Sequence, residues 1–222
     1  MFKKIISLAT LIIIILAFNC VDLRAGIQNN QAIPDEICIL NNYSGPISVE
    51  GVVTEPGETA AIKVNTNTQD KGTLALRLGF STFTLKFPTY GGTLPSGKTT
   101  TTALLDFNTI YWFATAQRTS LDEISIYNDS NSLITLMYNL NGLTPPQQIK
   151  PGLTKTKKVS VENEKKSGEK KGAILISDGC QSYTVEFLRR LYKKGMINKS
   201  DFNKVTLRLS TIQWFNNGFS VN

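Results

Sequence analysis

The residues best suited to do chemistry are basic side chains concentrated in the C-terminal half of the chain. Residues 26–118 carry six Lys or Arg and seven Asp or Glu, a net charge of −1, whereas residues 119–222 carry fifteen and nine, a net charge of +6. Clustered cations concentrate anionic partners locally. We therefore predict that an anionic glycan, a lipid surface or an acidic protein is bound by Lys155, Lys157, Lys158, Lys165, Lys166, Lys170, Lys171, Arg189, Arg190, Lys193 and Lys194.

A solubilising role is the alternative for the first of these segments. Residues 150–171, KPGLTKTKKVSVENEKKSGEKK, also contain Glu, Gly and Ser, a composition typical of a solvated loop. No aromatic residues are interleaved with the lysines, as they are in surfaces that bind single-stranded nucleic acid. Nucleic acid is therefore not an expected partner.

Other chemistry is largely excluded by composition. The sequence contains no histidine, which excludes imidazole-based triads and histidine metal ligands, and the three cysteines have no CxxC spacing. Neither GxxxxGK[ST] nor GxGxxG occurs. We expect no enzyme activity, cofactor or metal. A carboxylate-dependent hydrolase is a minor alternative, because adjacent acidic residues are usually solvated; its candidate residues are Asp35, Glu36, Asp122, Glu123, Asp178 and Glu186.

Cysteines and glycosylation sequons are candidate modification sites. Cys38 and Cys180 are an even pair in the chain beyond the N-terminal apolar segment, and we consider both a disulfide and two free thiols. NxS sequons begin at Asn42, Asn128 and Asn198, and the first two precede turns where a glycan would be exposed.

The elements that must position these residues follow from an internal repeat. Matches keep the same order, and their offset grows from 87 to 102, so the second copy carries the insertions. This pattern predicts a tandem duplication. The matching segments are ICILNNYSGPISV (37–49) with ISIYNDSNSLITL (124–136), GTLALRLGFSTFTLKF (72–87) with GAILISDGCQSYTVEF (172–187), and TIYWF (109–113) with TIQWF (211–215).

Apolar residues alternate with a period of two in both copies, and turn residues recur every 8 to 12 residues or so. We expect an all-β protein of two antiparallel β-sandwiches of immunoglobulin-like or jelly-roll-like type. One unit spans residues 33–118 and the other 119–222, with a basic insertion at 160–171. A single domain to which each unit contributes one sheet is the alternative.

Several local expectations follow from the alignment. Trp112 should superpose on Trp214 and Phe87 on Phe187, all buried in the core of their own unit. Residues 97–113 read as an ordinary strand, although a Ser/Thr-rich hairpin of a membrane-inserting toxin has a similar pattern. A strand should reach Phe187 and be followed by a helical turn.

The N-terminus resembles an export signal. Lys3 and Lys4 precede a 14-residue apolar run, shorter than a spanning helix requires. Cleavage after Ala25 removes residues 1–25 and gives a secreted or periplasmic protein without an integral membrane span. Lipid anchoring through Cys20 is the alternative localisation.

Together these observations predict an exported, non-enzymatic binding or adhesion protein whose second unit contacts an anionic surface or glycan. The alternative is a structural or assembly component of a cell envelope or extracellular matrix. Binding driven by charge weakens steeply with ionic strength, whereas an apolar protein interface does not.

Overall fold

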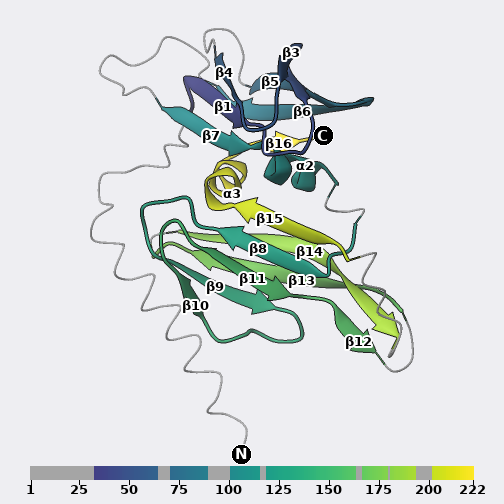
Figure 1. Ribbon diagram of the computed structural model, residues 1–222. Helices are drawn as coiled ribbons and strands as arrows, with labels where there is room; N and C mark the ends of the chain where they lie inside the picture. The colour runs from purple at the N-terminus through teal and green to yellow at the C-terminus, as the bar shows by residue number, and fades with distance from the viewer. Residues whose placement is uncertain are drawn as a thin grey trace, which may run out of the picture.

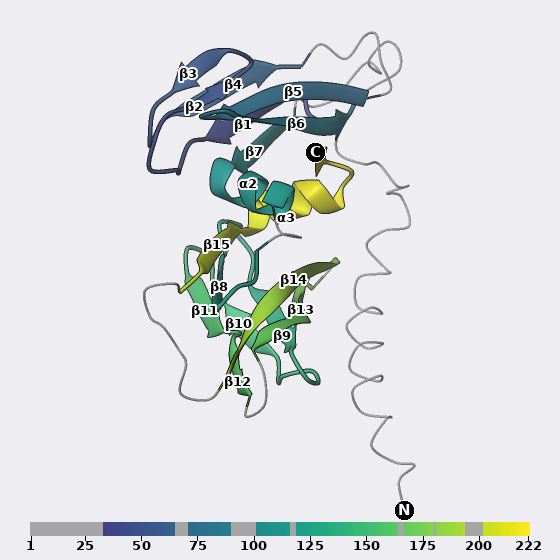
Figure 2. The same ribbon diagram turned by 90° about the vertical axis from the view of Figure 1, so that its right-hand side faces the viewer.

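The structure is a computed structural model that describes residues 33–64, 71–89, 101–115, 119–163, 167–179, 181–193 and 202–222. These residues are mostly in β-strands, with two short helices among them, so the expected all-β class is correct. Figures 1 and 2 show two β-structured halves with the helices α2 and α3 between them. Neither helix is long and apolar enough to cross a membrane. The predicted signal segment and Cys20 lie outside the described residues.

The first half consists of two sheets. The smaller has the order β4-β1-β7, in which β1 is antiparallel to β4 and parallel to β7. The larger has the order β16-β6-β5-β2-β3, and its neighbouring strands are antiparallel. The strands are β1 (Glu36–Leu40), β2 (Ile47–Val49), β3 (Val52–Thr54), β4 (Thr59–Lys63), β5 (Lys71–Leu78), β6 (Ser81–Pro88), β7 (Thr102–Asp106) and β16 (Ser220–Val221).

The second half has the same strand orders. Its sheets are β11-β8-β15, again with one antiparallel and one parallel pair, and β10-β9-β13-β14-β12. The sheets differ at one edge, where β12 runs parallel to β14 while β16 runs antiparallel to β6. The strands are β8 (Glu123–Tyr127), β9 (Ile134–Asn139), β10 (Gln147–Ile149), β11 (Thr154–Lys158), β12 (Val161–Asn163), β13 (Gly168–Ser177), β14 (Ser182–Lys193) and β15 (Lys204–Arg208).

Alternation of buried and exposed residues explains why these segments form strands around a core. In β9 the burial of side chains alternates along almost the whole strand, as the period-two sequence pattern predicts. Each half has one main hydrophobic cluster to which both of its sheets contribute. In each, a glycine lies opposite a buried phenylalanine: Gly72 pairs with Phe87 and Gly172 with Phe187.

The segments TIYWF and TIQWF are helical, so the strand expected there is wrong. They belong to α2 (Phe107–Thr115) and α3 (Leu209–Asn216). The Asp106 carboxylate caps α2, because its Oδ1 accepts a hydrogen bond from the Thr109 backbone N–H at 3.0 Å. A capping aspartate three residues before a threonine was the local signal for this helix.

The helical turn expected after Phe187 is also wrong. β14 continues to Lys193, and its pairing with β13 is unbroken from Ser177↔Ser182 to Gly168↔Leu191. The inserted residues 168–171 and 188–191 therefore pair with each other and lengthen one hairpin. A helical turn would have left one side of this extension without its ladder hydrogen bonds.

The C-terminal residues return to the first half. Ser220 and Val221 pair with Lys86 and Leu85 of β6, and Phe219 is buried in the first core. The C-terminal strand β16 is therefore an edge strand of the larger sheet of the first half.

Candidate functional site at the junction of the two halves

Each helix packs its Trp-Phe pair against the core of the opposite half. Phe107 and Ile110 of α2 pack in the first core, but Trp112, two residues further on, is buried in the second core. In α3 the order is reversed, since Leu209 and Ile212 pack in the second core while Trp214 and Phe215 pack against the first. The expectation that each tryptophan packs in its own unit is wrong. Trp214 is only half-buried, whereas Trp112 is 6% exposed.

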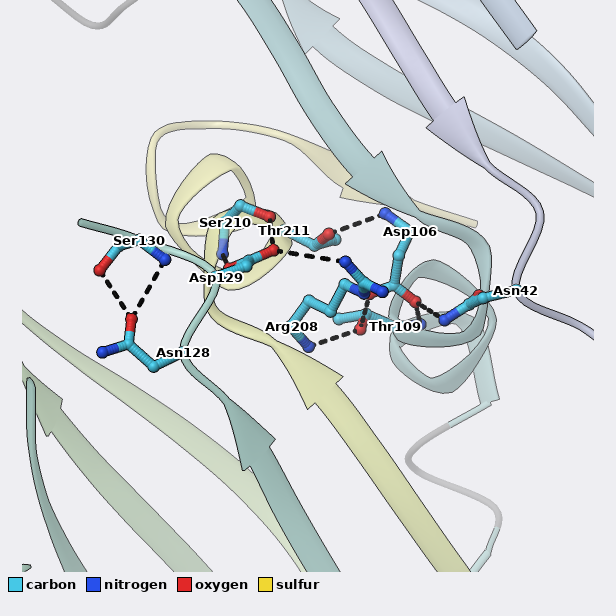
Figure 3. Close-up of polar contacts among 9 residues, drawn as sticks. All are labelled: Asn42, Asp106, Thr109, Asn128, Asp129, Ser130, Arg208, Ser210 and Thr211. Carbon is cyan, nitrogen blue, oxygen red and sulfur yellow. Dashed lines mark hydrogen bonds and ion pairs between the residues drawn. The ribbon is translucent and has the colours of Figure 1, made fainter. Parts of the chain in front are cut away.

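Reciprocal hydrogen bonds connect the starts of the two helices (Figure 3). The Asp106 backbone N–H donates to Thr211 Oγ1 at 2.9 Å, and the Arg208 backbone N–H donates to Thr109 Oγ1 at 3.0 Å. Asp106 and Arg208 are equivalent in the sequence repeat, as are Thr109 and Thr211. Contacts that pair i with j and j with i are typical of an interface between two symmetric copies.

The side chains at the same positions are not symmetric. In the first half Asn42 Nδ2 donates to Asp106 Oδ1 at 2.8 Å. In the second half Asp129 forms an ion pair with Arg208 at 4.0 Å and accepts hydrogen bonds from the Ser210 N–H and hydroxyl. Burial raises the pKa of Asp106, opposed by hydrogen bonds from Thr109 and Asn42 and by the charge of Arg208.

A cavity of about 350 Å³ lies beside this junction, between α2, β15 and the turn that contains Asn42. Most of its lining side chains are amides, hydroxyls and aromatic rings. The lining residues are Asn42, Asn108, Tyr111, Trp112, Thr115, Thr119, Leu121, Asn203, Lys204, Val205 and Thr206.

The Trp112 indole Nε1 is buried and has no hydrogen-bond partner. A buried N–H without an acceptor is unfavourable. Among the described residues no Asp or Glu lines the cavity, and the one lysine there, Lys204, pairs with Glu123 at 3.8 Å. The described part of the chain has no group of three potential metal-binding side chains. The arrangement therefore suits the binding of a polar ligand better than acid–base chemistry.

The predicted basic residues do not form one patch. Alternation along β11 places Lys155 and Lys157 on one face and Lys158 on the other. Lys157 lies 5.9 Å from the ring of Tyr138, while Lys158 lies opposite Glu123. Lys170 and Lys171 are exposed on β13 in the other sheet, and Lys193 is exposed on β14. Lys165, Lys166 and Lys194 lie outside the described residues.

Two of the predicted cations are not free on the surface. Arg189 is 1% exposed, so its prediction as a surface contact is wrong. Arg190 forms an ion pair with Asp122 at 3.5 Å. Asp122 is fully buried and also accepts hydrogen bonds from the Tyr192 hydroxyl at 2.7 Å and the Asn203 N–H at 2.8 Å. This carboxylate is therefore not solvated, contrary to the expectation for adjacent acidic residues.

Two of the three sequons serve the fold. Asn128 is fully buried, and its Nδ2 donates to the Ser132 and Ile149 carbonyls at 2.8 and 3.0 Å. The nitrogen that would carry a glycan is inside the folded protein, so the expectation of an exposed site there is wrong. The Asn42 side-chain nitrogen donates a hydrogen bond to Asp106 within the junction. Asn198 lies outside the described residues.

The disulfide remains a prediction. Cys38 has a free thiol, and burial, together with the nearby charge of Glu36, raises its pKa. Cys180 lies outside the described residues.

Comparison with known proteins identifies no relative: no family model matches the sequence, and no curated protein matches it.

Proposed function

We propose that this chain is an exported, non-enzymatic binding protein that holds a segment of a glycan in the junction cavity. Glycans present many hydroxyl groups, and the cavity offers amide, hydroxyl and aromatic side chains. The observation that carries the proposal is this lining, in which three asparagines, three threonines, Tyr111 and Trp112 border the cavity. Sugar hydroxyls exchange hydrogen bonds with such amides and hydroxyls, and the rings of Tyr111 and Trp112 offer aromatic faces.

In this proposal the two halves are tandem copies of a β-sandwich. The expectation of purely antiparallel sheets is wrong, because β1 is parallel to β7 and β8 is parallel to β15. Their equal strand orders support it, as do the glycine–phenylalanine pairs. Asn41 and Asn128, equivalent in the repeat, also make equivalent hydrogen bonds to backbone carbonyls. Export through the N-terminal segment, or anchoring through Cys20, follows from the sequence.

The positive charge of the second half favours an acidic glycan. Lys204 lines the cavity, and Lys155, Lys158 and Lys193 are exposed elsewhere on the same half. Exposed charges act mainly through a screened long-range field. Retention on an acidic glycan should therefore weaken as ionic strength rises.

A glycan array followed by titration with two matched variants tests the proposal. Trp112→Phe keeps an aromatic ring but shortens this part of the cavity wall, so the affinity should fall about three- to tenfold. Trp214→Phe is the control, because Trp214 is at the equivalent position but does not line the cavity. Equal affinities of the two variants would exclude the cavity as the site, and an array without any bound glycan would exclude the function.

A structural or assembly role is the second candidate, and it has its own observation. Phe80 at the tip of the β5–β6 hairpin is fully exposed, and Val52 and Val53 on the edge strand β3 are 61% and 62% exposed. Exposed apolar groups beside a free strand edge suit a protein partner. Self-association that persists at high salt and is lost in Phe80→Ser would favour this role.

A further inference from the structure

The extended β13–β14 hairpin brings two cations directly opposite each other. Arg189 of β14 pairs in register with Lys170 of β13, so both side chains leave the sheet on the same face. Like charges at such a position repel each other, and this pair lies in the insertion that distinguishes the second half from the first.

Arg189 is buried without a countercharge among the residues that the structure describes. Its Nη2 donates to the Leu140 carbonyl and, at 2.8 Å, to Asn141 Oδ1, but its Nε and Nη1 are buried and have no hydrogen-bond partner. Among the described residues no carboxylate forms an ion pair with Arg189. Burial of an unpaired charge is strongly unfavourable.

Asn141 connects the two cations. Lys170 Nζ donates to the same Asn141 Oδ1 at 2.6 Å, so one neutral amide oxygen is the shared acceptor of both groups. Lys170 and Asn141 are exposed and border a surface hollow of about 340 Å³. Within the described part of the chain, Glu186 is the one carboxylate that lines this hollow, and it opposes binding of an anion on that side.

We propose that Arg189, Lys170 and Asn141 form a binding site for a tetrahedral oxyanion, a sulfate or phosphate group. The oxyanion replaces Asn141 Oδ1 between the two cations and accepts hydrogen bonds from the guanidinium and the ammonium group, which are stronger than those to a neutral oxygen. Asn141 and Lys170 are exposed, so their side chains are free to turn aside when the anion enters. The site is separate from the junction cavity and does not depend on the proposed function.

Thermal unfolding of the purified protein in sodium sulfate, sodium phosphate and sodium chloride at equal ionic strength tests the site. Sulfate and phosphate should raise the Tm along a saturating curve, as expected for binding to the folded state. A general salt effect does not saturate in this way. A heparin disaccharide, which carries the same group as a sulfate ester, distinguishes a ligand-borne group from the free ion.

Three variants make the result specific. Arg189→Met and Lys170→Met should abolish the saturating rise, while Lys155→Gln, an exposed lysine on the other sheet, should retain it. Without sulfate or phosphate, Arg189→Met should be at least as stable as the wild type, because an unpaired buried charge is replaced by an apolar side chain. If Arg189→Met fails to fold, the Tm response of Lys170→Met alone tests the site. An equal response of the wild type and Lys170→Met would overturn the site, as would a wild type without a saturating response.

Discussion

The rings of Phe113 and Phe215 stack against each other with centroids 4.4 Å apart and an interplanar angle of 11°. These two residues occupy the same position of the repeated motif, TIYWF in one half and TIQWF in the other. A residue that meets its own counterpart lies where two related units face each other. The stack therefore marks the centre of the junction that holds the two halves together.

Replacement of either stacked ring should weaken this junction. We expect Phe113→Ala or Phe215→Ala to lower the free energy of unfolding by about 2 kcal/mol, less than for a fully buried phenylalanine because both rings are half-buried. The double variant should lose less than the sum of the single losses, by about 0.5 to 1.5 kcal/mol, the range measured for aromatic pairs. Urea denaturation measures all three, and Phe80→Ala, fully exposed, serves as the unaffected control. Strict additivity would contradict an energetic role for the stack.

The glycine opposite each core phenylalanine should not tolerate a side chain. A Cβ at Gly72 would lie 2.1 Å from the Phe87 ring, and one at Gly172 would lie 2.8 Å from the Phe187 ring. Both rings are buried and cannot move aside, so Gly72→Ala and Gly172→Ala should each cost about 1 to 3 kcal/mol through overpacking. Gly45→Ala is the matched control, because a Cβ there meets nothing within 4 Å. Similar thermal stability of all three variants would show that the close approach is unimportant.

Stability should depend on pH through Asp106. Its pKa is raised in the folded protein, chiefly by burial. The folded state therefore holds this proton more tightly than the unfolded chain does, and the associated stability is lost as pH rises above about 4, the ordinary value for aspartate. Asp106→Asn cannot titrate. The free energy of unfolding of the wild type, measured relative to Asp106→Asn, should fall as pH rises from about 4 toward neutrality. Parallel pH profiles of the two proteins would refute this assignment.

Tyr138 and Tyr183 allow a comparison of how a buried hydroxyl affects stability without and with a hydrogen-bond partner. Both are buried, but Tyr138 Oη has no partner, and burial raises the Tyr138 pKa to about 12. Tyr183 Oη lies 2.7 Å from Gln181 Oε1. Tyr138→Phe should leave the free energy of unfolding unchanged or raise it by up to about 1 kcal/mol, whereas Tyr183→Phe should lower it by about 1 kcal/mol. Chemical denaturation compares them, and a large loss in Tyr138→Phe would show that this hydroxyl has a partner after all.

Local signals in the sequence were enough for several of the strands. Alternation in segments such as EICIL and ITLMYN follows directly from the two faces of a strand, and the paired glycines and phenylalanines share one register in both halves. The helices were missed because TIYWF is as compatible with a strand as with one short helix. For α2 the capping contact of Asp106 with Thr109 is a local signal, but α3 has no side-chain cap and therefore no such signal.

The candidate site depends on contacts between residues far apart in the chain, which a single sequence does not specify. Charge, composition and repeat length are properties of the sequence itself, and they determined the all-β class, the basic second half and the equivalence of positions such as Thr109 and Thr211. Tertiary structure alone decided that Trp112 packs in the core of the other half and that Arg189 is buried beside Lys170. The reason is physical: burial and pairing depend on which surfaces meet, and the same alternating pattern allows a lysine or a tryptophan to face solvent, its own core or a neighbouring unit.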